Sequence, residues 1–139
     1  MTDITRRSSP APQVDGFSAQ HSDYLSNGLQ AGLVLTKGDA CYLDANGRVQ
    51  KAVSTVIGIT GSHLAESKFD GLVNENYTSG TYGVSLYGAG AIVGYGSGMT
   101  VGKFLYVSSN AGNLADAMPS AVDRPVAKVI SATDILILR

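Results

Sequence analysis

The chain has 139 residues, a formal net charge of −1, and charged residues at only 15% of its composition. This length fits one domain with a core of its own. The basic residues are scattered and do not form the clusters that attract nucleic acids or anionic membranes. The single cysteine, Cys41, excludes an internal disulfide or a paired-cysteine metal site, and we expect it to be a small buried hydrophobe.

The first 30 residues differ from the rest of the chain. Residues 8–12 are a Ser/Pro breaker cluster, and the following segment is polar with isolated aromatics at Phe17 and Tyr24. No helical or strand period persists here, and no apolar stretch resembles a signal peptide or a membrane span. We predict an extended N-terminal arm over residues 1–30 that orders on docking, because a purely solvating tail gains nothing from aromatics. A disordered tail is the other interpretation.

From residue 33 onward the pattern is that of β-strands. Asp44 and the Asn46-Gly47 pair predict a tight turn at residues 44–47. Residues 62–69 fit either a loop or one or two helical turns. The strands predicted in this half are 33–36, 40–43, 48–53 and 56–60.

Residues 80–98 are rich in glycine. Alternation places Tyr82, Val84 and Leu86 on one strand face, with Gly83, Ser85 and Tyr87 on the other. Repeated glycines inside strands indicate barrel corners or a close protein–protein contact, or simply β-bulges.

The C-terminal part again alternates strands and turns. The predicted strands are 103–107, 113–115, 126–130 and 134–138, with a turn at 108–112. Residues 135–138 read Ile-Leu-Ile-Leu, and the absence of polar alternation predicts a strand buried on both faces.

One pattern occurs twice. Thr-x-Gly-x-x-x-Tyr begins at Thr36 and again at Thr100, and each copy is followed by an Asn-containing turn. Downstream, residues 56–59 loosely match residues 126–129. The pattern fits a duplicated hairpin in a pseudo-symmetric barrel, or convergence of unrelated hairpins. In both cases the expected fold is all-β, a small β-barrel or β-sandwich over residues 31–139.

The sequence holds no catalytic or metal-binding constellation that we can recognise. His21 and His63 have no second ligand at metal spacing, and the acidic residues are spread singly. Asp39, Asp44 and Asn46 are near one another but lack the spacing of a calcium loop. We therefore predict no enzyme activity, no metal and no cofactor.

Several segments resemble the family of phage capsid decoration (cement) proteins. They are KGDACYLDANGRVQKA (37–52), VIGIT (56–60), VSLYGAGAIVG (84–94), GMTVGKFLYVSSNAGNLADA (98–117) and RPVAKVISATDILIL (124–138). The resemblance implies a small β-barrel or β-sandwich, often trimeric, made in the host cytoplasm and placed on the outer capsid of a bacteriophage. There it would clamp neighbouring major capsid protein subunits at three-fold and quasi-three-fold positions. The N-terminal arm matches no pattern of this family.

A protein of this kind works through its surfaces. Residues 76–102 contain no charged side chain, and interfaces are depleted in charge and enriched in tyrosine. We expect at least half of the tyrosines in this stretch to be core. The predicted interface residues are Phe17, Tyr24, Tyr77, Tyr82, Tyr87 and Tyr95.

The expected function is that of a homotrimeric virion protein that binds the major capsid protein, and neither nucleic acid nor membrane. The alternative is a phage fibre or host-surface module that binds glycans, although the tryptophan usual in sugar sites is absent.

Overall fold

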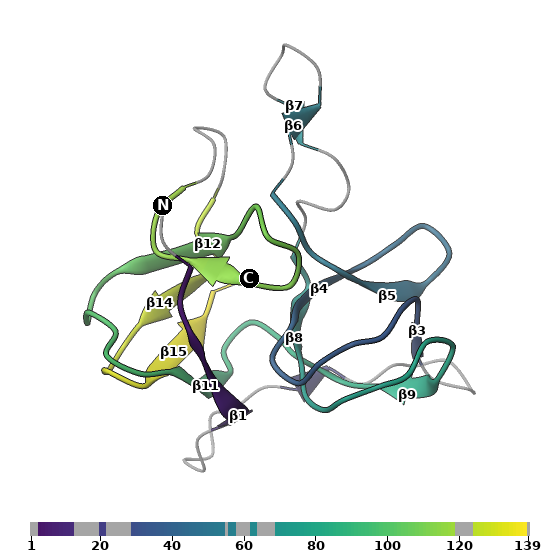
Figure 1. Ribbon diagram of the computed structural model, residues 1–139, viewed down its shortest axis with the longest axis horizontal. Helices are drawn as coiled ribbons and strands as arrows, with labels where there is room; N and C mark the ends of the chain where they lie inside the picture. Colours follow the sequence, from purple (N-terminus) through teal and green to yellow (C-terminus); the bar gives the residue numbers. More distant parts are fainter. Residues whose placement is uncertain are drawn as a thin grey trace.

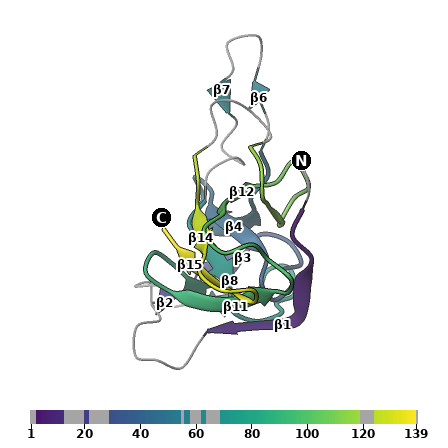
Figure 2. The same cartoon turned by 90° about the vertical axis from the view of Figure 1, so that its left-hand side faces the viewer.

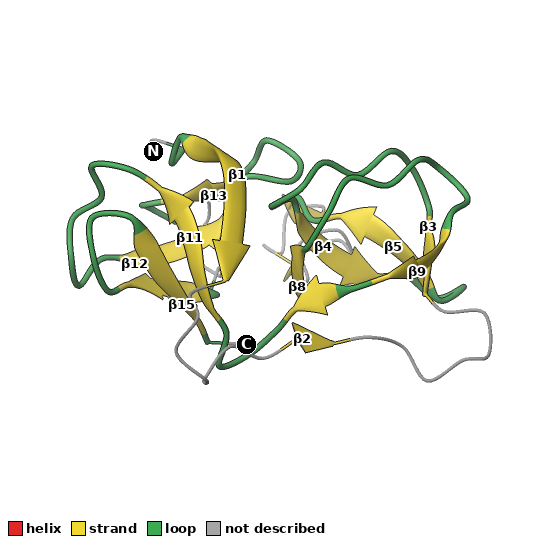
Figure 3. Cartoon of the chain, turned by 90° about the horizontal axis from the view of Figure 1, so that it is seen from below, coloured by secondary structure: helices red, strands yellow, loops and turns green. Residues whose placement is uncertain are grey.

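The computed structural model describes residues 3–12, 20–21, 29–54, 56–57, 62–63, 69–118 and 124–138. These residues form strands and turns and no helix, which confirms the all-β prediction (Figure 3). In the described part of the chain, accordingly, no helix is long and apolar enough to cross a membrane.

The strands form two curled sheets that lie side by side (Figure 1). The six-stranded sheet has the order β1-β11-β15-β14-β12-β13. Its strands are β1 (Arg6–Pro12), β11 (Ile92–Gly96), β12 (Phe104–Val107), β13 (Leu114–Ala115), β14 (Ala127–Val129) and β15 (Asp134–Ile137).

The seven-stranded sheet has the order β2-β10-β8-β4-β5-β3-β9. Its strands are β2 (Gln20–His21), β3 (Leu29–Ala31), β4 (Ala40–Leu43), β5 (Arg48–Lys51), β8 (Gly71–Val73), β9 (Tyr82–Val84) and β10 (Leu86–Tyr87). A short ribbon of β6 (Val56–Ile57) and β7 (Ser62–His63) stands apart from both sheets (Figures 1 and 2).

Two hydrophobic clusters stabilise these sheets. The smaller one fills the seven-stranded sheet and includes Leu35, Cys41, Val49, Val73 and Leu86. The larger one fills the six-stranded sheet and continues onto the opposite face of the seven-stranded sheet. Its members from that face are Ala40, Tyr42, Ala52, Phe69, Leu72 and Tyr87. The two sheets therefore share one core and form a single folded unit.

The two sheets are built on the same plan. The order β2-β10-β8-β4-β5 in one corresponds to β11-β15-β14-β12-β13 in the other. The registers agree as well: Ala40 pairs with Leu72 as Phe104 pairs with Lys128. The two copies of the motif thus form equivalent hairpins, and the equivalence extends to five strands. We call the part that forms the seven-stranded sheet the first repeat and the part that forms the six-stranded sheet the second.

The glycine of the repeated motif explains why both copies turn in the same way. Gly38 and Gly102 have positive φ angles of 88° and 92°, which a residue with a Cβ rarely adopts. The Gly38 N–H donates to Val73 O, and the Gly102 N–H donates to Val129 O, each at 2.9 Å. The counterpart of β14 is therefore β8, so the predicted match between residues 56–59 and 126–129 is wrong. Residues 56–57 lie in the separate ribbon instead.

Two other predictions need correction. Residues 33–36 are not a strand, because only Leu35 makes an isolated bridge, to Tyr77. Tyr82 does not share the buried environment of Val84, because Gly83 has a φ of 87° and the pairing with β3 shifts register there. This bulge leaves Tyr82 54% exposed while Val84 is fully buried.

The last strand is buried on one face only. Ile135 and Ile137 are in the core, whereas Leu136 is half-buried and Leu138 is 39% exposed. The prediction of burial on both faces is therefore wrong for the single chain. In the order of the sheet, β15 lies between β11 and β14, so its outer side chains share the outer face of these strands.

The N-terminal segment is extended, and its described parts are paired. Asp3 bridges to Ala115, β1 pairs with β11, and β2 pairs with β10. Residues 6–12 are therefore part of the six-stranded sheet, and Asp3 is bridged to its edge strand β13. Phe17 and Tyr24 lie outside the described residues.

The burial of the core predicts a large contrast between two isoleucines of the second repeat. Ile135→Ala removes a fully buried side chain from the shared core and should cost about 2–5 kcal/mol of unfolding free energy. Ile130→Ala changes a side chain that is 40% exposed and should cost less than about 1 kcal/mol. Urea unfolding followed by circular dichroism measures both, and equal costs would contradict the placement of β15.

Candidate functional site

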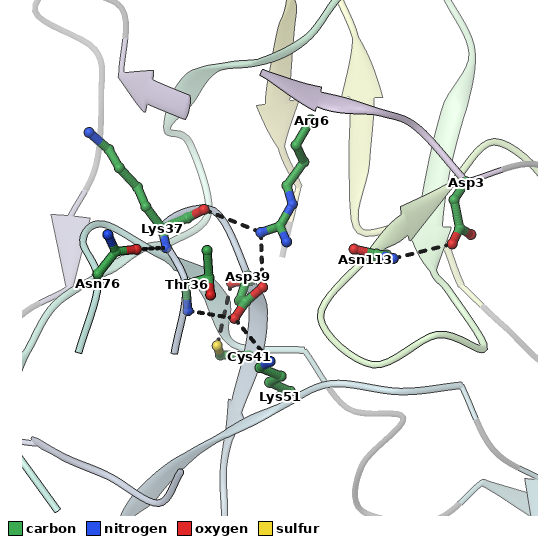
Figure 4. A network of polar contacts seen from close by, with 9 residues as sticks. All are labelled: Asp3, Arg6, Thr36, Lys37, Asp39, Cys41, Lys51, Asn76 and Asn113. Atoms are coloured by element: carbon green, nitrogen blue, oxygen red, sulfur yellow. Dashed lines mark hydrogen bonds and ion pairs between the residues drawn. The ribbon is translucent and has the colours of Figure 1, made fainter. Parts of the chain in front are cut away.

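The junction of the two sheets contains a buried carboxylate. Asp39 is 1% exposed and is the only buried charged residue in the part of the chain that the structure describes. Its Oδ1 lies 2.9 Å from Arg6 Nη1, its Oδ2 lies 3.7 Å from Lys51 Nζ, and the Thr36 N–H donates to Oδ2 at 2.8 Å (Figure 4). The negative charge of this carboxylate is therefore balanced by Arg6 and Lys51 within the protein.

The Asp39 contacts join the two repeats. Arg6 begins β1 of the six-stranded sheet, and Asp39 precedes β4 of the seven-stranded sheet. Arg6 Nη1 also lies 3.3 Å from the Lys37 carbonyl, to which it donates. Gly112 faces the same carboxylate: a Cβ there would lie 2.9 Å from Asp39 Oδ1, and its φ is +85°. The cluster is therefore a structural joint and not an open reaction site.

Backbone hydrogen bonds close the same junction. The Ala40 N–H donates to Gly112 O at 2.9 Å, and the Gly112 N–H donates to Ala52 O at 2.8 Å. The Ser54 N–H donates to Ser108 O at 2.8 Å. The loop of residues 108–113 in the second repeat thus lies directly against the first repeat.

Asp3 ties the N-terminus to this loop. Its carboxylate accepts hydrogen bonds from Ser108 Oγ, from Asn110 Nδ2 at 2.8 Å and from Asn113 Nδ2 at 3.3 Å. Partial burial by itself raises the pKa of Asp3, but the hydrogen bonds from Asn110, Ser108 and Asn113 together hold that pKa below its ordinary value of 3.8. Asp3 is thus an anchor for the first residues of the chain.

Asp44 organises the turn between β4 and β5. Its Oδ1 accepts the N–H groups of Asn46 and Arg48, each at 2.9 Å, and its Oδ2 accepts from Gln50 Nε2 at 3.0 Å. Slight burial raises the pKa of Asp44, but these hydrogen bonds and the Arg48 charge lower it below the ordinary range. Asp39 and Asp44, two of the residues weighed for calcium, are thus engaged in junction and turn contacts. Among the described residues no group of three or more His, Cys, Asp or Glu could hold a metal ion.

Cys41 is fully buried, as predicted. Its Sγ lies 3.4 Å from the Asp39 carbonyl oxygen. Burial and the nearby Asp39 charge raise the pKa of the Cys41 thiol far above its ordinary value, so the thiol stays protonated at neutral pH. A protonated, buried thiol is a packing group and not a nucleophile.

The predicted interface tyrosines divide into core and surface. Tyr95 is fully buried and Tyr87 is 8% exposed, and both belong to the shared core. This confirms that at least half of the tyrosines in residues 76–102 are core, and it removes these two from the surface of the single chain. Tyr82 is 54% exposed, and Tyr77 is half-buried.

A groove runs beside Tyr77. It has a volume of about 300 Å³, and its lining consists of Val34, Leu35, Thr36, Asn76, Tyr77 and Thr78. The Tyr77 hydroxyl donates to Asn74 Oδ1 at 2.6 Å, which fixes the ring at the groove wall. Val34 is 59% exposed at this site. Uncharged walls with a few polar groups suit a docking surface better than a catalytic one.

Sequence reasoning missed most of the exposed apolar side chains. Val101, Phe104 and Ile130 are not among the interface residues predicted from the sequence. The structure leaves them 64%, 43% and 40% exposed. Lys128, which stands between Ala127 and Val129 in β14, was the available sign of an outer face.

The chain has no detectable relatives in two comparisons. No protein-family model matches it, and a search of the curated proteins finds no match.

The buried junction predicts that Asp39 is needed for stability. Asp39→Ala leaves Arg6 and Lys51 without their shared partner and should cost about 3 kcal/mol of unfolding free energy. The matched control Glu75→Ala removes an exposed carboxylate and should cost less than about 0.5 kcal/mol. Denaturant unfolding measures the difference, and an Asp39 variant as stable as the control would refute the junction's role.

The Asp3 contacts predict an acid-dependent contribution to stability. The pKa of Asp3 is lower in the folded chain than its ordinary value of 3.8, so ionised Asp3 stabilises the fold above that value. That contribution is lost as pH falls through the folded pKa. The melting-temperature difference between the unmodified chain and Asp3→Asn should therefore be large at neutral pH and shrink in acid. The contribution of Asp44 to the pH dependence cancels in this difference, because both chains contain Asp44. A melting-temperature difference that does not change with pH would contradict this account.

Proposed function

We propose that this chain is a structural virion protein that docks on the outer surface of a phage capsid and stabilises it by bridging major capsid protein subunits. The proposal combines the resemblance of residues 33–139 to decoration proteins with one structural observation. That observation is the uncharged, partly apolar groove lined by Val34 and Tyr77, together with the exposed Tyr82 ring in β9 of the same sheet. It offers a partner apolar contact and hydrogen-bonding groups but no reaction centre.

The chemistry of this surface sets the expected mode of binding. Val34 and Tyr82 provide exposed apolar area, and Asn76 and Thr78 provide side-chain hydrogen-bonding groups. Because residues 76–102 contain no charge, ion pairs contribute little from this stretch. Docking through it should consequently survive raised salt, unlike an electrostatically held complex.

Stabilisation of a shell follows from linkage. A protein that binds only the assembled shell stabilises it by RT ln(1 + [L]/Kd) per site, or about 2.7 kcal/mol at 100 times Kd. Repetition over many equivalent sites makes the total large. We also propose that the protein acts as a homotrimer, since closed cyclic symmetry matches a three-fold docking position.

Add-back to stripped shells tests the function. Shells stripped of this protein are heated with and without it, and added protein should raise the disruption temperature. The double variant Val34→Ser/Tyr82→Ser should bind shells about tenfold more weakly or worse, because it removes the exposed apolar groups. Ser109→Ala, an exposed change on another loop, is the matched control and should bind normally.

An unchanged disruption temperature at full occupancy would reject the cementing role. The glycan-binding alternative has one feature in its favour, the exposed Tyr82 ring, on which a sugar could stack. A glycan-array signal that Tyr82→Ser abolishes, from a protein that does not bind shells, would favour that alternative.

A further inference from the structure

The outer face of the first repeat is covered within the chain. Ala40, Leu72 and Tyr87 are direct partners across β4, β8 and β10 and form one row of that face. Their exposed fractions are 0%, 0% and 8%, because the row packs into the core of the second repeat. The Ala40 N–H even donates to Gly112 O in the loop of residues 108–113. In Figure 1, β4 and β8 lie on the side of their sheet that faces the six-stranded sheet.

The equivalent face of the second repeat is open. The register places Phe104, Lys128 and Leu136 where the first repeat has Ala40, Leu72 and Tyr87. Phe104 is 43% exposed, Lys128 is exposed, and Leu136 is half-buried. Lys128 Nζ lies 5.7 Å from the centroid of the Phe104 ring. Figures 1 and 3 show β12 and β15 on the side of the molecule away from the seven-stranded sheet.

The neighbouring side chains enlarge this open face. Ile130 is 40% exposed two residues after Lys128, and Val101, beside the turn that donates to Val129 O, is 64% exposed. We call Val101, Phe104, Lys128, Ile130 and Leu136 the open face. An apolar patch of this kind on a small chain marks an interaction site.

Two physical arguments indicate that the occupant is another copy of the same fold. Terminal units of stacked repeats normally present a polar outer face, but four of the five open-face residues are apolar, with Asp134 on the same side of β15 as Leu136. In addition, the all-apolar run of residues 135–138 is typical of a strand covered on both sides. The first repeat shows what covers such a face in this fold. It is the loop of residues 108–113, which follows β12 in the second repeat.

We propose that the open face binds a second copy of this chain, which presents the turn between its β4 and β5. Residues 44–47 of that turn occupy the place in the first repeat that residues 108–113 occupy in the second, since Leu43 pairs with Val49 as Val107 pairs with Leu114. Leu43 is 38% exposed and would contribute the apolar contact. The turn would approach from the side from which the 108–113 loop approaches Ala40, but it would pack on the exposed Phe104 ring, because Phe104 replaces the small Ala40 at this position.

The contact is heterologous, since the second repeat of one copy meets the first repeat of the next. Such contacts close into a ring when the rotation between copies allows it, and the trimer proposed above would be one such ring. The inference goes beyond capsid docking, because it concerns the purified protein. Failure to bind shells would leave it untouched.

Sedimentation velocity at rising protein concentration tests self-association. The unmodified chain should form species larger than its 14.4 kDa monomer at tens of micromolar. Phe104→Lys should weaken association by about tenfold or more. Tyr82→Lys, which changes an exposed aromatic residue on the other sheet, should associate normally. Ile130→Lys provides a second open-face variant, and an unchanged melting temperature shows that each variant is folded.

Mixing two variants tests the heterologous geometry. Phe104→Lys and Leu43→Lys should each remain monomeric, while their mixture should form dimers and stop there, because one intact pair of faces remains. An unmodified chain that stays monomeric, open-face variants that assemble normally, or a Leu43→Lys variant that assembles alone would each overturn the proposal.

Discussion

The structure depends on one buried carboxylate at the junction of its two sheets. A charge as buried as Asp39 is costly unless it is paired and hydrogen-bonded, and here Arg6, Lys51 and the Thr36 N–H provide those partners. Arg6 belongs to the N-terminal strand of the six-stranded sheet, so satisfying Asp39 also fixes the N-terminal strand against the seven-stranded sheet. Position 112 requires glycine, because a Cβ there would collide with the same carboxylate.

The two repeats share one plan, and the residues in which they differ explain the surfaces of the fold. In register, Asp39 of the first repeat corresponds to Lys103 of the second, and Ala40 corresponds to Phe104. Asp39 and Ala40 face the second repeat. The Asp39 carboxylate is paired with Arg6 and Lys51, and the small Ala40 side chain allows the 108–113 loop to approach. Lys103 and Phe104 lie at the open end, where they are exposed. Equivalent backbone positions thus have opposite environments.

The molecule offers surfaces on both repeats. The groove beside Tyr77 lies on the first repeat, and the open face lies on the second. A protein that bridges subunits of an assembly needs more than one such surface, since a single contact can attach but cannot bridge. The acidic residues of the described chain that are most engaged, Asp3, Asp39 and Asp44, all hold the fold together through hydrogen bonds or ion pairs. The carboxylates that stabilise the fold are thus distinct from the surfaces that are available to partners.

The sequence by itself determined the all-β class, the hairpins around residues 44–47 and 108–112, the duplicated Thr-x-Gly-x-x-x-Tyr motif and the burial of Cys41. These features are local, because turn chemistry, strand alternation and the need of glycine for a positive φ act over a few residues. Which apolar faces are covered was decided only by the tertiary structure. Tyr95 and Phe104 look alike in a strand pattern, yet one is fully buried and the other is 43% exposed. The difference depends on which face of each strand meets the other repeat, and that is set by packing between residues far apart in the chain.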